Sequence, residues 1–220
     1  LERIEVLRGA SSMLYGQLAP GGVINAISKR PVDQPLHEVN VEYGSYDRKQ
    51  LSADFGGPLT EDGVLSYRLT GLVRNADSWV ENTPDNKVYI APALTWKPDS
   101  TTRLTILGNF QRDILGAFYP FLPAQGTVLP NPNGKVPTGA FYGDTDFNAY
   151  SRVQSALGYQ FEKRIGEVWT LRQNFRFNRF RVDNWQQEYG ASLDADQRTL
   201  ERIPFISTGD SRGYALDNQA

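Results

Sequence analysis

The feature that most constrains the fold is a regular alternation of apolar and polar residues along several long segments. Within residues 86–97, Val88, Ile90 and Leu94 alternate with Lys87 and Thr95. Successive side chains of a β-strand point to opposite faces, so a period of two predicts strands with one apolar and one polar face. The clearest further examples are residues 63–76, 102–112, 150–163 and 168–178.

Eight candidate strands follow one another from His37 onward, and the last, near residues 198–219, has the weakest pattern. The clear ones approach the roughly 9 to 11 residues that a tilted membrane-crossing strand needs, whereas strands of globular proteins average about 5 to 6. Strand length therefore favours a membrane-spanning sheet.

The connections between these strands alternate between short and long. Tight polar turns are predicted at 58–62, 97–101 and 163–167, and longer loops at 77–85, 114–149 and roughly 184–197. Outer-membrane barrels have short turns on the periplasmic side and long loops outside. The connection at 45–48 departs from this rule, because it is short although it belongs to the loop side.

Two tryptophans agree with this orientation. Trp96 lies just before a predicted short turn and Trp169 just after another, both on apolar faces. Indole rings concentrate at the membrane–water interface, where barrels carry aromatic girdles. A soluble β-sandwich would alternate in the same way, but strand length, loop asymmetry and these tryptophans favour the barrel.

Eight strands close only into a small barrel filled by its own side chains, which leaves no room for residues 1–31. A barrel that encloses a separate folded element needs about 22 strands. The expected fold is therefore all-β, a partial transmembrane antiparallel β-barrel with about the first eight of about 22 strands. We expect the chain to be part of a longer protein.

Composition excludes several function classes. The 23 basic and 25 acidic residues give a net charge of −2, so no strong positive field attracts nucleic acid. The chain has no cysteine and a single histidine, His37, so we expect no metal site and no catalytic constellation. The glycines at 16–22 are not followed by Gly-Lys-Ser/Thr, which argues against a phosphate-binding loop.

Two N-terminal motifs resemble a known family. "LERIEVLRGASSMLYG" (1–16), followed by "PGGVINAISKRP" (20–31), is similar to the end of the plug domain in TonB-dependent outer-membrane siderophore receptors of the ferrichrome-receptor type. The resemblance continues through "SYRLTGL", "APALTWKPD" and "LPAQGTVLPNPNGKVP". It implies that residues 1–31 are the C-terminal part of a plug domain and residues 32–220 the N-terminal part of the barrel.

The function implied by this resemblance is TonB-dependent uptake of a ferric siderophore, of the hydroxamate type, across the bacterial outer membrane. TonB would bind an upstream segment, outer-membrane lipid would surround the barrel, and the siderophore would carry the iron, so no cofactor and no enzymatic activity are expected. The alternatives are a receptor for another ligand, such as cobalamin or an oligosaccharide, or a soluble β-rich binding module.

The long loop 114–149 is the main ligand-site candidate, because long loops without regular structure are uncommon unless they are functional or disordered. It is rich in aromatic residues and contains five prolines, which limit its flexibility. By the resemblance, "FYPFLP" falls where receptors of this type place aromatic ligand contacts. The predicted ligand-binding residues are Phe118, Tyr119 and Phe121, with Trp185 and Tyr189 from the next loop. The alternative is that these aromatics pack one loop against another.

Charged residues on the polar faces have two readings. Arginines at positions 68, 74, 152, 172 and 176 could guide an anionic ligand, or they could pair with carboxylates, which buried charges generally need. The resemblance implies that Arg3, Glu5 and Arg8 of the plug segment contact charges of the barrel.

Overall fold

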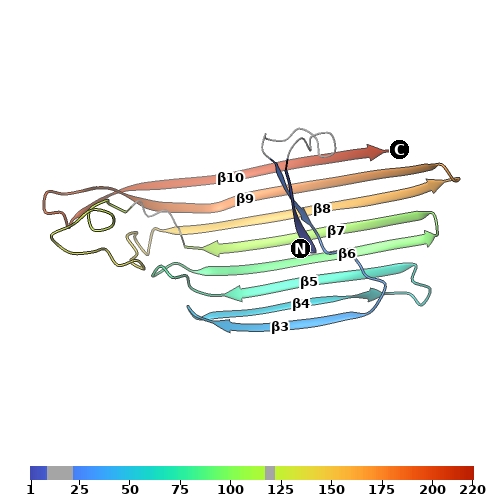
Figure 1. The fold of residues 1–220 in the computed structure, drawn as a ribbon, viewed down its shortest axis with the longest axis horizontal. Helices are drawn as coiled ribbons and strands as arrows, with labels where there is room; N and C mark the ends of the chain where they lie inside the picture. Colours follow the sequence, from blue (N-terminus) through green and yellow to red (C-terminus); the bar gives the residue numbers. More distant parts are fainter. Residues whose placement is uncertain (9–21, 117–121) are drawn as a thin grey trace.

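The protein is all-β in the computed structural model, which describes residues 1–8, 22–116 and 122–220 (Figure 1). In these ranges no helix is long and apolar enough to cross a membrane. A small two-stranded sheet contains β1 (Arg3–Leu7) and β2 (Val23–Ile27). An eight-stranded sheet contains β3 (Leu36–Gly44), β4 (Arg48–Pro58), β5 (Leu65–Asn75), β6 (Asp85–Asp99), β7 (Thr102–Leu115), β8 (Ala149–Ile165), β9 (Trp169–Leu193) and β10 (Leu200–Gln219).

The large sheet is an antiparallel meander in which each strand pairs with the strand before it. The strands lie in the order β3 to β10, so β3 and β10 are the two edges. All eight predicted strands are present, including the weakly patterned last one. This confirms the antiparallel sheet that the alternation predicted.

Register places the apolar and polar sets on opposite faces. Leu94 pairs with Ile106, which pairs with Tyr159, and these residues form one row of the apolar face. The neighbouring row contains Thr95, Thr105, Gln160 and Asn174. A slip of one residue would have mixed the two sets, so the predicted division of faces is confirmed.

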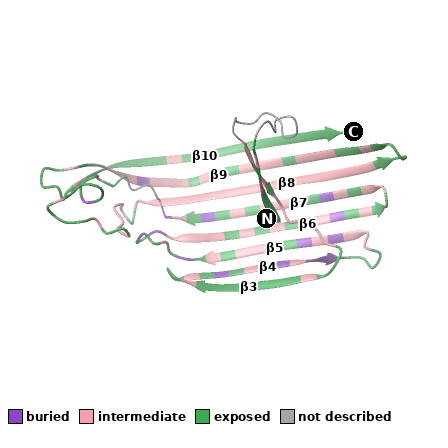
Figure 2. Cartoon of the chain, viewed as in Figure 1, coloured by how far each residue is buried: buried purple, intermediate pink, exposed green. Residues whose placement is uncertain are grey.

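The N-terminal hairpin β1–β2 crosses the polar face, which we call the inner face (Figure 1). Side chains buried in β4 to β7 lie on this face, and most are polar: Gln50, Asp54, Ser66, Arg68, Ala93, Thr95, Thr105 and Asp113. The apolar outer face is left open, with Leu157 58% exposed. Figure 2 shows the buried residues within β4 to β7, whereas the edge strands β3 and β10 are mostly exposed. A soluble sandwich buries its apolar face, so this arrangement favours a sheet whose outer face contacts lipid.

The two ends of the large sheet differ. Figure 1 shows the connections after β4, β6 and β8 at one end, the turn end, and the connections after β3, β5, β7 and β9 at the other, the loop end. The two long connections, β5–β6 and β7–β8, are both at the loop end. Trp96 lies near the end of β6 and Trp169 begins β9, so both tryptophans lie at the turn end on the outer face. Their exposed fractions are 45% and 59%. The predicted placement at one end is confirmed.

The prediction of a loop over residues 184–197 was wrong. β9 continues to Leu193 and pairs there with the first half of β10, which leaves a connection of only residues 194–199. This stretch, "NWQQEYG", contains no aliphatic residue and has only Trp185 and Tyr189 among polar residues, so its alternation is weak. This stretch is a strand because its backbone forms hydrogen bonds with β10. A hydropathy pattern gives no information on such pairing.

The N-terminal hairpin needs glycine where it reaches β2. Gly22 has φ of 140°, and a Cβ atom there would lie 2.6 Å from the carbonyl oxygen of Leu7. Only glycine adopts such a backbone without strain. Residues 23–27 form β2 and pair with β1. The other glycines of this motif, at positions 9, 16 and 21, lie outside the described residues.

Candidate functional site

Asp54 on the inner face joins the N-terminal segment to the large sheet. Its carboxylate accepts hydrogen bonds from Nε and Nη2 of Arg68 on β5, at 2.9 and 2.8 Å. Lys29, which follows β2, donates to the same carboxylate at 2.5 Å. Asp54 is only 4% exposed, so this ion pair is shielded from water.

Further contacts of the N-terminal segment extend this network. Glu2, just before β1, lies 3.3 Å from Nη1 of Arg68, which also donates to the carbonyl oxygen of Arg30. Lys97 at the turn end pairs with Asp33 in the linker at 2.6 Å. Removing one member of the buried Lys29–Asp54–Arg68 group leaves the others uncompensated, so this group fixes the segment in place. The Asp33 side chain is 69% exposed, so its ion pair adds little.

Two of the three N-terminal residues that were predicted to contact charges of the barrel have other partners in the described part of the chain. Arg3 and Glu5 pair with each other at 2.7 Å, and Asn25 of β2 donates to Glu5. Arg8 forms no ion pair within the described part of the chain. The ionic contacts to the large sheet come instead from Glu2 and Lys29, which sequence reasoning missed although Lys29 belongs to the quoted "SKRP" motif. Contacts of Arg3, Glu5 and Arg8 with a complete barrel stay a prediction.

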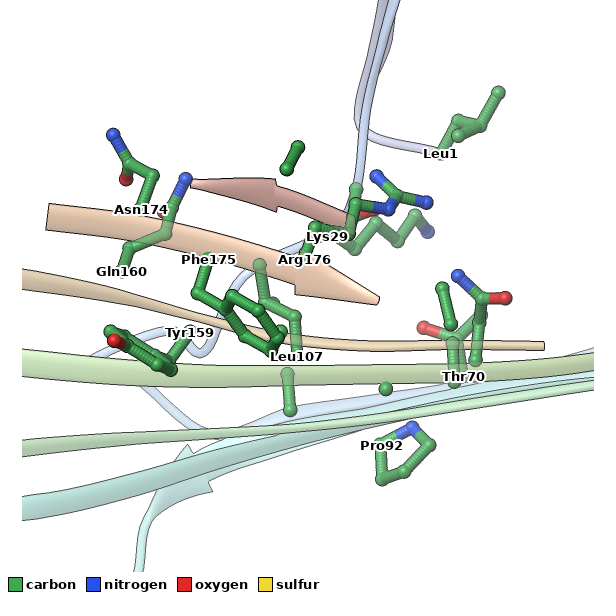
Figure 3. A pocket seen from close by; sticks show the side chains of 18 of the residues that line it. Leu1, Lys29, Thr70, Pro92, Leu107, Tyr159, Gln160, Asn174, Phe175 and Arg176 are labelled. Carbon is green, nitrogen blue, oxygen red and sulfur yellow. The ribbon is translucent and has the colours of Figure 1, made fainter. Parts of the chain in front are cut away.

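A cavity of about 250 Å³ lies between this segment and the sheet (Figure 3). Leu1 and Lys29 line it from the N-terminal side, and Thr70, Leu107 and Arg176 line it from the sheet. The register places Leu107 on the inner face, although the other large apolar residues of 102–112 lie on the outer face. Its position on the polar face is explained by the cavity, which it lines.

A second pocket, of about 380 Å³, lies at the loop end, and we call it the loop-end pocket. Its walls include Pro84, Leu115, Tyr150, Arg152 and Trp185. The Trp185 ring lies edge-on to Tyr150, with ring centroids 5.8 Å apart. Two aromatic faces beside a guanidinium can contact both apolar and oxygen-rich surfaces of a ligand.

A β-bulge brings Trp185 to this pocket. Val182 of β9 pairs with Arg152, whereas Asn184 pairs with Ser151, so Asp183 is an extra residue. A bulge reverses which residues face each side of a strand. Trp185 consequently pairs with Tyr150 on the inner face. Its indole Nε1 donates to Gln187 at 3.1 Å, and its ring also lies edge-on to Phe205 at 5.3 Å.

The predicted ligand residues are therefore only partly placed. Trp185 lines the loop-end pocket from β9 rather than from a loop. Tyr189 is also on β9, where its backbone pairs with Ile203. The segment with Phe118, Tyr119 and Phe121 lies outside the described residues. Sequence reasoning missed Tyr150, which the strand pattern marked only as the start of β8.

The inner-face arginines have carboxylate partners at four of the five positions. Arg68 pairs with Asp54, Arg74 with Asp85, Arg152 with Asp113 and Arg172 with Glu162. At the fifth position, Arg176 donates to the side chain of Asn178 at 2.7 Å. The reading in which these charges are mostly paired is confirmed.

Three connections are held together at the loop end. The Asn131 side chain donates to the carbonyl oxygen of Gln197 at 2.9 Å, and Asn133 donates to that of Asp196 at 3.1 Å. The amide of Glu81 donates to the carbonyl oxygen of Gly139 at 2.9 Å. The long loop is thus tied to the connections on both sides of it.

The Asp196 carboxylate shapes the β9–β10 connection. It accepts hydrogen bonds from the backbone amides of Thr199 and Arg198, and from the Thr199 hydroxyl. These donors stabilise the ionised carboxylate and lower the pKa of Asp196 to about 2. The described ranges contain no group of three or more residues able to hold a metal ion.

Comparison with known proteins gives consistent relatives, although no family model matches. The chain is 38% identical to the ferrichrome outer membrane transporter/phage receptor of Escherichia coli K12 over 225 residues, covering 100% of the chain and 30% of the relative. It is 31% identical to the ferrioxamine receptor of Yersinia enterocolitica, again covering 100% of the chain and 30% of the relative. The chain therefore spans about 30% of the length of these relatives.

Solved structures show the same fold. The FpvAI–pyocin S2 complex matches with a TM-score of 0.86 at 20% identity, covering 98% of this chain and 29% of that one. The open form of the ferric-catecholate import receptor Fiu from E. coli K12 matches with a TM-score of 0.79 at 21% identity, covering 98% and 35%. Along its whole length, the chain is thus similar to a segment of TonB-dependent outer-membrane siderophore receptors that makes up about 30% of their length.

Proposed function

We propose that this chain is the segment of an outer-membrane receptor that holds the end of the plug against the first barrel strands and contributes to binding a ferric siderophore. The whole receptor takes up the iron complex with energy delivered through TonB. Residues 1–31 act as the C-terminal part of the plug, and residues 32–220 as the first barrel strands.

One observation carries this proposal: the buried face of the large sheet is the polar one, and the N-terminal segment covers it through the Lys29–Asp54–Arg68 network. A wall that is apolar outside and polar inside suits a lipid-embedded pore. A charged segment held inside such a wall closes the pore, and its ion pairs can separate and form again when the plug moves.

The loop-end pocket supports a role in binding at the outer mouth. Trp185 and Tyr150 offer aromatic surface, and Arg152 offers N–H donors, at the end of the sheet that carries the long connections. Phe118, Tyr119 and Phe121 lie in the sequence between β7 and β8, whose loop ends flank this pocket. We assign these aromatics, with Tyr189, to the ligand site.

The relatives suggest the class of siderophore. The two named above are receptors for ferrichrome and ferrioxamine, both hydroxamate siderophores. Iron in such a complex is already coordinated by hydroxamate oxygens, so the receptor needs aromatic surface and hydrogen-bond donors rather than metal ligands of its own.

The experiment is a titration of the purified full-length receptor in detergent. Tryptophan fluorescence is measured while ferrichrome or ferrioxamine B is added, each with its iron-free form as the matched control. We expect saturable quenching by a ferric hydroxamate complex. A folded receptor whose fluorescence is unaffected by every ferric siderophore would contradict the proposed function.

A further inference from the structure

One buried carboxylate lies between two cations that line different cavities of the inner face. Asp113 on β7 is 1% exposed and lies between two cations from the neighbouring strands. Nζ of Lys87 on β6 is 3.2 Å from Oδ1, and Nε of Arg152 on β8 donates to Oδ2 at 2.9 Å. Gln111 donates to Oδ2 at 2.7 Å.

The two cations reach different cavities. Arg152 lines the loop-end pocket, whereas Lys87 lines a polar cavity between the N-terminal segment and the sheet. A ligand that moves inward from the loop end therefore passes this cluster. The partly exposed side chains of Lys87 and Arg152, at 26% and 31%, flank the carboxylate.

We propose that Arg152 donates hydrogen bonds to the iron-binding oxygens of the siderophore, and that Asp113 sets the preference of the receptor for uncharged over multiply anionic ferric complexes. This inference rests on the proposed function and adds the charge class of the ligand. Arg152 acts as a binding residue and Asp113 as a positioning residue.

The geometry of the guanidinium supports the first part. Asp113 engages Arg152 through Nε, which leaves the Nη groups free of that carboxylate. Hydroxamate oxygens bound to iron are polarised acceptors, and a planar guanidinium held in one orientation suits them. Lysine at this position would keep the charge but lose the fixed pair of donors.

Charge supports the second part. Asp113 cancels one of the two positive charges of Lys87 and Arg152, and the nearby Arg74 is paired with Asp85. Three hydroxamates cancel the charge of Fe(III), so their complex is neutral, whereas three catecholates leave a multiply negative complex. The cluster of Lys87, Asp113 and Arg152 has a small net charge but still offers hydrogen bonds to a neutral hydroxamate complex. An anionic catecholate complex loses hydration on binding, and a cluster of small net charge compensates little of that loss.

The test measures a ratio of affinities in the full-length receptor. Dissociation constants for ferrichrome and for a ferric tris-catecholate are measured at low salt in the wild type and in Asp113→Asn, which keeps the shape of the side chain. We expect the variant to shift the ratio toward the catecholate by about tenfold, because one negative charge near a multiply charged ligand is removed. The shift should shrink at high salt.

The matched control is Glu162→Gln. Glu162 pairs with Arg172 on the same inner face, but it lies opposite Arg103, ten residues along β7 from Asp113. That separation is about 33 Å, which exceeds even the Debye length of about 30 Å at 0.01 M salt. The control removes the same charge, and we expect the affinity ratio to stay within twofold of the wild type.

A second variant covers the case in which Asp113→Asn does not assemble. Arg152→Lys keeps the charge and should weaken ferrichrome binding by about tenfold while changing the affinity ratio less than Asp113→Asn does. A folded Asp113→Asn receptor with an unchanged ratio, or Arg152→Lys with unchanged ferrichrome affinity, would overturn the inference. A wild type that binds neither complex would overturn the proposed function as well.

Discussion

Lys29 and Asp54 lie 25 positions apart in the sequence and form an ion pair that joins the N-terminal segment to the large sheet. The same carboxylate is held by Arg68 from the next strand. Because the pair is nearly buried, we expect its loss to destabilise the attachment of the whole N-terminal segment to the sheet.

Replacing Asp54 by Asn should loosen the N-terminal segment. The change leaves Lys29 and Arg68 facing each other without a counter-charge, and removal of one partner of a buried pair typically lowers stability by about 3 to 5 kcal/mol. Limited proteolysis of the full-length receptor should then cut the N-terminal segment faster. Glu162→Gln, in an ion pair about half exposed, is the control and should leave the cleavage rate unchanged.

Replacing Gly158 by Ala should destabilise the sheet. A Cβ atom at this position would lie 2.4 Å from the carbonyl oxygen of Phe175 on the neighbouring strand, a backbone atom that cannot move without distorting the β8–β9 ladder. Overpacking of this kind lowers stability by about 1 to 3 kcal/mol. Heat-induced unfolding of the receptor, followed by gel mobility, should begin at a lower temperature.

Gly213→Ala on β10 is the matched control, because a Cβ atom there meets nothing within 4 Å among the described atoms. Equal unfolding temperatures for the two alanine variants would show that the close approach at Gly158 has no energetic consequence.

The alternation predicted most of the fold because its cause is local. Each residue of β5 to β8 faces either lipid or the interior, so hydropathy records the face directly, as Leu94 and Thr95 show. This reasoning did not predict the part of β9 at the loop end, residues 184–193. Gln186 and Gln187 are strand residues because they pair with Ile206 and Phe205 of β10, and Gln186 also pairs with Ala149 of β8.

The site was harder to predict because it depends on tertiary pairing. Nothing near Asp54 in the sequence reveals that its partners are Lys29 and Arg68. The face of Trp185 depends on a single extra residue at Asp183, whose presence is visible only in the register against β8. Aromatic composition pointed to Trp185 as a ligand residue, but not to the loop-end pocket that it lines.

Replacing Trp185 by Ala should weaken binding of the ferric hydroxamate complex. The indole lines the loop-end pocket with Tyr150, and truncating such an aromatic anchor commonly costs about 2 kcal/mol, roughly a 30-fold loss of affinity. Isothermal titration calorimetry on the full-length receptor gives the affinity. Trp185→Phe keeps an aromatic ring and should recover most of it.

The double variant Tyr119→Ala with Phe121→Ala tests the long loop in the same assay. A ligand role predicts that affinity for one siderophore falls by about 30-fold while receptor assembly is unchanged. If this variant and Trp185→Ala both bind every siderophore as the wild type does, the aromatic assignment of the site is wrong.

The β9–β10 connection should respond to acid through Asp196. Its pKa is lowered from an ordinary value of 3.8 to about 2 by hydrogen bonds from Thr199 and Arg198. A lowered pKa means that the folded turn favours the ionised group, so this stabilisation is complete above about pH 4 and is lost as the pH falls toward 2. The protection factor of the Thr199 amide, which is its intrinsic exchange rate divided by its observed rate, should fall over that window.

Asp196→Asn should show fast exchange at Thr199 at neutral pH already, and Asp146→Asn on the long loop should not. An acid-induced loss of protection of the same size in the Asp196→Asn variant would assign the pH response to another group.

Uptake of iron by intact cells tests the central claim most directly. Cells that lack their own siderophore receptors, and that produce the full-length receptor at the surface, are given radiolabelled ferrichrome or ferrioxamine B, with and without a functional TonB. We predict accumulation of iron from at least one of these complexes only where TonB is present. No accumulation from either complex, or equal accumulation without TonB, would contradict the account.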